Sequence, residues 1–136
     1  MAQVIIFTNE NGGVSVCVPT GELDINTVKA KDTPSHSIIV EASVLPEEDN
    51  DFFNAWELQG TAVTVNLDKA KALTKDRLRQ ERAPLLQAQD VLYMKALEQG
   101  QPTAAIVAEK ERLRNITLLA DACTTTAELR ALGAAA

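Results

Sequence analysis

The hydrophobic pattern of this chain changes once, near residue 67. Before that point apolar and polar residues alternate in short runs separated by turn residues, a pattern typical of half-buried strands. After it apolar residues recur every three or four positions, a pattern typical of amphipathic helices. The pattern therefore predicts an α+β protein. Residues 1–67 would form a small acidic, antiparallel β domain, and residues 68–136 an α-helical hairpin with a short C-terminal helix.

The first part predicts two hairpins and about four strands in one small sheet. Residues 4–8 and 14–18 are the strands of the first hairpin, joined by an Asn-Gly-Gly turn whose residues adopt positive φ at low cost. Residues 37–42 predict a further strand. The second hairpin runs from Trp56 to Leu67, because apolar residues alternate on both sides of Gln59-Gly60.

Short helical segments are predicted between these strands. Asp24 begins a segment at 24–30 and is a favourable N-cap, and Pro34 stops that segment. Pro46, followed by a run of acids, has the residue order that suits the first turn of a short helix.

The second part predicts two long helices. Asp68 is the expected N-cap of the first, whose apolar stripe continues to Leu97. Pro84 lies inside this stripe and removes one hydrogen bond, which leaves two alternatives, a kinked helix or two helices that meet there. Gly100-Gln101-Pro102 ends this element. A second helix, also of 15 or more residues, follows from about Thr103 and continues as far as Ala120.

The hairpin is expected to bind identical or neighbouring subunits, and apolar residues of both helices are expected to bury its seam and to belong to this partner-binding region: Leu86, Leu92, Leu97, Ile106 and Leu113. Others lie outside this stripe, and four short strands cannot cover them all, so the surplus predicts contacts with other chains. Thr125 and Glu128 have the spacing of a capping box for a last short helix. Gly133 and the three alanines after it predict a frayed end.

The composition agrees with a folded domain, because 46% of the 136 residues are hydrophobic and 24% are charged. These values exclude a wholly disordered or collagen-like chain. No apolar run approaches the roughly 18–20 residues of a membrane helix, so no membrane partner is expected. The stretch 1–7 has neither a basic region nor a small-residue cleavage site, and we therefore expect folding in the cytoplasm.

Charge is unevenly distributed between the two parts. Residues 1–66 contain ten acids and two lysines, a net charge of −8, whereas residues 67–136 contain eleven bases and nine acids, a net charge of +2. The overall charge of −6 argues against nucleic-acid binding, which needs a concentrated positive surface.

One basic cluster stands out in the first predicted helix: Lys69, Lys71, Lys75, Arg77, Arg79 and Arg82. Asp76 and Glu81 lie between these bases and Asp68 directly precedes them, so the cluster is either a solvated helix face or a docking surface for an acidic partner or for the acidic half of the chain. If it docks a partner, Arg77, Arg79 and Arg82 make the contact. Replacing these three with Glu is then expected to abolish docking and to leave the fold intact.

The residue patterns that mark an enzyme or a metal site are missing from the sequence. Cys17 and Cys123 are far apart and His36 is the single histidine, which is neither a zinc-ligand nor a triad pattern. No Gly-x-Gly-x-x-Gly, Gly-x-Ser-x-Gly or His-Glu-x-x-His occurs. The acids at 47–51 match no calcium-loop spacing. We therefore predict no enzyme activity, no catalytic residue, no cofactor, no metal and no small-molecule substrate.

Several segments follow one another in a recognisable order. They are a tryptophan-bearing hairpin (56–65), Asp68-Lys69-Ala70-Lys71, the stretch RLRQERAPLL (77–86), Asp90-Val91 and the stretch KERLRNIT (110–117). The opening IFTNENGGVSV (6–16) belongs to the same set. Together these features cover most of the chain, and they resemble small proteins encoded in the tail regions of tailed bacteriophages and prophages.

The resemblance implies a non-enzymatic role in a virion or in its assembly. Expected partners are other virion proteins, namely tail, fibre or connector subunits, together with further copies of this chain. The expected location is the virion, assembled in the cytoplasm of the bacterial host. The alternative that the resemblance leaves open is an assembly chaperone that binds a tail or fibre protein and is absent from the mature particle.

Overall fold

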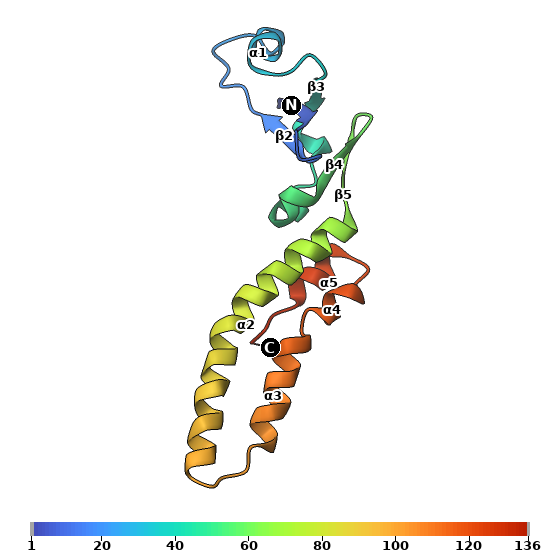
Figure 1. Ribbon diagram of the computed structural model, residues 1–136. Coiled ribbons are helices and arrows are strands. Elements are labelled where there is room, and N and C mark those ends of the chain that lie inside the picture. The colour runs from blue at the N-terminus through green and yellow to red at the C-terminus, as the bar shows by residue number, and fades with distance from the viewer. Residues whose placement is uncertain (1, 136) are drawn as a thin grey trace. The chain divides into compact units, whose positions relative to one another are not determined.

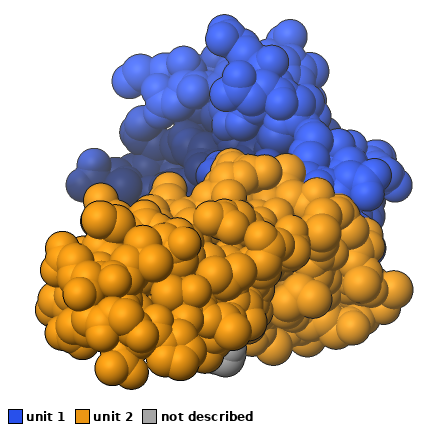
Figure 2. Space-filling view, turned by 60° about the horizontal axis from the view of Figure 1, so that its bottom comes forward, with its two compact units in different colours: residues 1–69 blue, residues 70–136 orange. Residues whose placement is uncertain are grey.

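The computed structural model describes residues 2–135 and confirms the α+β class (Figure 1). The chain divides into two compact units, residues 1–69 and residues 70–136, which Figure 2 shows in separate colours. The sequence pattern put the boundary after residue 67. Each unit contains its own cluster of buried hydrophobic side chains.

The described residues of the first unit form five strands in two antiparallel sheets. β1 (Gln3–Thr8) is the central strand of one sheet, with β2 (Val14–Cys17) on one side and β3 (Ile38–Glu41) on the other. β4 (Trp56–Gln59) pairs only with β5 (Ala62–Val65). The single sheet predicted from the sequence is therefore wrong. Both edges of β1 are already paired, and the second hairpin contributes through its side chains instead.

The core of the first unit joins the two sheets. Trp56 and Val63 from the second hairpin cluster with Val4, Ile6 and Val14 from the first. Trp56 is 3% exposed, and its indole N–H donates to the Asp49 carbonyl oxygen at 3.2 Å, so the polar atom of the ring is paired as well.

Short helices connect these strands. α1 (Ile25–Asp32) begins after Asp24, whose carboxylate accepts the Asn26 N–H at 3.1 Å, so the predicted N-cap is confirmed. η1 (Ala42–Val44) follows β3. The segment predicted after Pro46 is longer than one turn: η2 (Glu47–Ala55) consists of 3₁₀ turns interrupted at Asp49 and Phe52, and it extends up to β4.

α2 (Leu67–Glu98) is one continuous helix through Pro84, so the alternative of two helices is wrong. Its axis changes direction about midway in Figure 1. Pro84 and Gln80, the residue four positions earlier, are both exposed, and water can reach the carbonyl that loses its partner. Asn66 rather than Asp68 caps the start, because the Asn66 carboxamide accepts the Lys69 N–H at 3.1 Å.

The remaining helices return along α2. Gly100 ends α2 with a φ of +65°, a value that glycine adopts without strain. α3 (Ala104–Asn115) runs antiparallel to α2 (Figure 1) and is shorter than predicted, since α4 (Leu118–Asp121) is a separate turn. α5 (Thr126–Ala131) follows. Its capping box is confirmed, because the Thr125 side chain accepts the Glu128 N–H at 3.1 Å.

Candidate protein-docking surface

The hairpin seam predicted from the sequence is formed at one end only. Leu113 is fully buried, and Leu86 packs beside it in the cluster that also contains Leu78, Ile116 and Ala134. Ile106 is half-buried. Leu92 and Leu97 are 46% and 53% exposed, so their assignment to the seam is wrong.

Leu92 and Leu97 are exposed because α3 covers a different face of α2 in its last turns. Ala96 is 8% exposed and Tyr93 is half-buried, whereas the leucines on either side of them are exposed. Lys110 of α3 reaches this part of α2: its Nζ lies 2.6 Å from Asp90 Oδ1 and 5.2 Å from the centre of the Tyr93 ring. An ion pair and a cation–π contact therefore hold α3 to α2 where a leucine seam was expected.

Five large apolar side chains are left uncovered at this end, and we call them the distal surface: Val91, Leu92, Met94, Leu97 and Val107. They lie in the last two turns of α2 and the first turn of α3, on either side of the loop at 99–103. Their exposed fractions are between 43% and 56%. Eleven large hydrophobic residues are exposed in the described chain, and five of them gather in these three helical turns.

The three arginines predicted to dock a partner have different positions. Arg79 is exposed and pairs with Asp76 at 2.7 Å. Arg77 pairs with Glu81 at 2.7 Å and also donates to the Leu129 carbonyl oxygen at 3.1 Å.

Arg82 donates to the carbonyl oxygens of Leu113 and Arg114, at 3.3 and 2.8 Å, and so satisfies acceptors at the end of α3. Arg77 and Arg82 therefore stabilise the helical unit. A triple replacement would disturb its fold, and Arg79 is the arginine that can be tested for docking separately.

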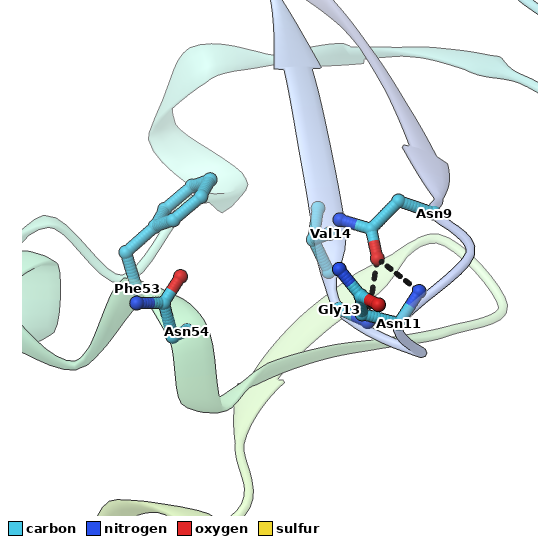
Figure 3. Close-up of a pocket in the computed structure, with 6 residues that line it drawn as sticks. All are labelled: Asn9, Asn11, Gly13, Val14, Phe53 and Asn54. Carbon is cyan, nitrogen blue, oxygen red and sulfur yellow. Dashed lines mark hydrogen bonds between the residues drawn. The ribbon is translucent and has the colours of Figure 1, made fainter. Parts of the chain in front are cut away.

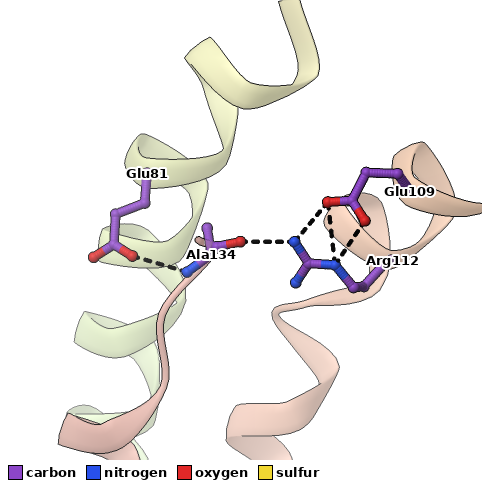
Figure 4. A network of polar contacts seen from close by, with 4 residues as sticks. All are labelled: Glu81, Glu109, Arg112 and Ala134. Carbon is purple, nitrogen blue, oxygen red and sulfur yellow. Dashed lines mark hydrogen bonds and ion pairs between the residues drawn. The ribbon is translucent and has the colours of Figure 1, made fainter. Parts of the chain in front are cut away.

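Residues 132–135 follow α5 and form a strap against both long helices. Ala134 is fully buried, so the frayed end predicted from the sequence is wrong at this position. Its N–H donates to Glu81 Oε1 at 3.0 Å, and its carbonyl oxygen accepts from Arg112 Nη2 at 2.8 Å (Figure 4). The two side chains come from α2 and α3, so one residue of the strap bonds to both helices.

Hydrogen bonds and ion pairs hold the side chains of Glu81 and Arg112 in place. The hydrogen bond from the Ala134 N–H, followed by that from Arg77, lowers the pKa of Glu81 below its usual value. The hydrogen bond with Arg112 lowers the pKa of Glu109 in the same way, and the two groups are 2.7 Å apart. Both carboxylates are therefore ionised at neutral pH and act as acceptors.

The described part of the chain contains no group of three His, Cys, Asp or Glu side chains placed to hold a metal ion. Cys17 is half-buried, and the buried Cys123 donates to the Leu119 carbonyl oxygen at 3.4 Å. His36 is exposed, with Nε2 3.2 Å from the Thr8 carbonyl oxygen. Among the described helices none is both long enough and apolar enough to cross a membrane.

The distal surface therefore stands as the candidate site, and its chemistry is that of contact between proteins. Sequence reasoning included Leu92 and Leu97 among the partner-binding residues but expected the hairpin seam to bury them, whereas both are exposed. In comparisons of this chain with protein-family models, curated proteins and solved structures, no match was found.

Proposed function

We propose that this chain is a non-enzymatic structural component of a tailed-bacteriophage virion, in the tail or the head-to-tail region. It acts there through protein–protein contacts and is present in multiple copies. The observation that carries the proposal is the distal surface, where five large apolar side chains remain 43–56% exposed on a paired-helix support.

The distal surface has the composition of an interface. Its centre is aliphatic and includes a methionine, a flexible side chain that adapts to different partners. Exposed charged residues, Lys95 and Glu98, lie beside the apolar ones, in the position of a polar rim. Contact between water and the five apolar side chains costs free energy, and an apolar face on another subunit would remove that cost.

The resemblance to phage tail-region proteins supplies the biological setting for this surface. Tail, fibre and connector subunits are the partners that it implies, and repeated copies of one chain are the usual way in which such assemblies are built. The exposed Arg79 offers a further contact for an acidic neighbour. The proposed location is the assembled virion, with assembly in the cytoplasm of the bacterial host.

Light-scattering mass determination of the purified full chain tests self-association through the distal surface. We expect the mass to rise with protein concentration for the natural chain. The double variant Val91→Gln/Leu97→Gln is expected to stay monomeric. Val18→Gln is the matched control, because Val18 is 71% exposed but lies outside the distal surface. Equal masses for the double variant and the control at every concentration would exclude this surface as the self-association site.

Mass spectrometry of purified particles tests the virion role separately. A structural component is expected in the finished particle in a fixed ratio to the other tail proteins, and the Val91→Gln/Leu97→Gln variant in a reduced ratio. Detection in assembly intermediates but not in finished particles would overturn the structural role in favour of an assembly chaperone.

A further inference from the structure

A hollow of about 210 Å³ lies in the first unit, remote in sequence from the distal surface. One wall is the turn between β1 and β2, and the other is the end of η2 (Figure 3). The lining residues are Asn9, Asn11, Gly13, Val14, Phe53 and Asn54.

The wall formed by the β1–β2 turn is held in one conformation. The Asn9 carboxamide oxygen accepts the N–H groups of Asn11 and Gly13, at 3.0 and 3.1 Å, and its nitrogen donates to Ser15 Oγ at 3.2 Å. Gly12, at the tip, has a φ of +79°. These local bonds fix the turn without any ligand, so binding would not have to order it.

The opposite wall presents an aromatic ring. Phe53 is 37% exposed, although the aromatic side chains on either side of it, Phe52 and Trp56, are 6% and 3% exposed. Its ring centre lies 4.9 Å from that of Trp56, at an interplanar angle of 56°. Because Trp56 is itself fixed in the core, this contact holds the Phe53 ring, which lines the hollow (Figure 3).

The lining combines this ring with carboxamides and contains no charged side chain. A carboxamide both donates and accepts hydrogen bonds, and so does a hydroxyl group. A sugar ring has hydroxyl groups at its edge and a face of C–H groups that packs on an aromatic ring. The volume is below the roughly 300–1,000 Å³ typical of sites for drug-sized ligands, which suits a single ring.

We propose that this hollow binds a neutral saccharide, with one sugar ring packed on Phe53 and its hydroxyl groups bonded to the carboxamides of Asn11 and Asn54. The charge of the unit favours a neutral ligand. Residues 1–66 have a net charge of −8, which opposes phosphorylated or carboxylated ligands. The hollow is only partly enclosed, so single sugars are expected to bind weakly, with oligosaccharides binding more tightly.

The test uses ¹H–¹⁵N spectra of the full chain, titrated separately with methyl glycosides of glucose, galactose and N-acetylglucosamine. At least one sugar is expected to shift the side-chain amide signals of Asn11 and Asn54 and the backbone signal of Gly13, saturably. Asn54→Ala is expected to weaken binding at least threefold, and Phe53→Leu at least tenfold, since leucine keeps an apolar side chain but has no ring. Asn26→Ala, which changes an exposed asparagine outside the hollow, is the matched control.

Several outcomes would overturn the proposal. They are the absence of saturable shifts with all three sugars, shifts centred on other residues, or binding that survives both Asn54→Ala and Phe53→Leu. Adenosine serves as a second ligand, because a nucleobase also stacks on an aromatic ring and bonds to asparagine. Tighter binding of adenosine than of any sugar would assign the hollow to a nucleobase and overturn the saccharide. The backbone spectrum of each variant shows that it is folded.

Discussion

The two ends of the α2–α3 pair have nearly opposite construction. At the end near α5, Leu78 and Leu113 are fully buried, and Ala134 of the strap closes the cluster. At the loop end the helices are joined by the Lys110–Asp90 ion pair, and the large apolar side chains face outward. The first end is packed as the core of a fold, and the second exposes the apolar side chains that the proposed partner would cover. Stability and association are therefore expected to respond to different residues of the same helices.

The two ends are expected to differ most in the free energy of unfolding that is lost when a leucine is replaced by alanine. Leu113→Ala removes a fully buried side chain and should lower the free energy of unfolding by about 2–5 kcal/mol. Leu97→Ala removes the same atoms from a residue that is 53% exposed and should change it by less than about 0.5 kcal/mol. Urea unfolding followed by circular dichroism measures both values. Similar losses for the two variants would mean that the loop end is packed in solution.

Removal of the N-cap of α5 is expected to cause the next largest loss of stability at the buried end. Thr125→Ala removes the acceptor of the Glu128 N–H and should cost about 1 kcal/mol. Leu129 of α5 is fully buried, so fraying of this helix would loosen core packing as well. Thr125→Ser keeps the hydroxyl group and is the matched control. If the serine variant were as unstable as the alanine variant, the cap would not be the cause.

The strap adds a pH dependence to the buried end. The folded-state pKa of Glu81 lies below its ordinary value of 4.5, chiefly because of the Ala134 N–H. A lowered pKa means that the stabilisation is fully present above the unfolded-state pKa and is lost as the pH falls through the folded-state pKa. Relative to the intrinsic exchange rate at each pH, the protection of the Ala134 amide should therefore fall in that acidic range, before global unfolding.

Glu81→Gln keeps the shape of the side chain but removes the charge. It should speed Ala134 exchange already at neutral pH and lower global stability by less than about 1 kcal/mol, as is usual for exposed charge pairs. Glu98→Gln, which removes an exposed charge from the other end of α2, serves as the control. Unchanged Ala134 exchange in Glu81→Gln would show that the Glu81 charge does not hold the strap.

The features that the sequence predicted are those set by residues close together along the chain. Asp24 capping α1 and Thr125 with Glu128 capping α5 are examples, because each cap joins residues two or three positions apart. The α+β class follows from periodicity, which is also local.

The features that it missed depend on residues brought together by folding. Arg82 meets the end of α3 from 31 and 32 positions away, and Glu81 meets Ala134 across 53. The exposure of Leu92 and Leu97 depends on the rotation of α2 about its own axis relative to α3. The contact between Lys110 and Tyr93 helps to fix that rotation. An apolar stripe wide enough to face several directions does not fix that rotation.

The smallest effect is expected at the loop end, from its one ion pair. Asp90→Asn removes the charge opposite Lys110, and because Asp90 is 60% exposed the loss should be no more than about 0.5 kcal/mol. The local consequence should be larger than this value suggests, since the leucines of this end provide no seam in its place. Amide exchange in α3 near Ile106 should accelerate while exchange near Leu113 stays unchanged. Asp76→Asn, which breaks the exposed pair with Arg79, is the matched control. Equal acceleration at Ile106 and Leu113 would show that the two ends open as one unit, and a distal surface that is independent of the core would then be excluded.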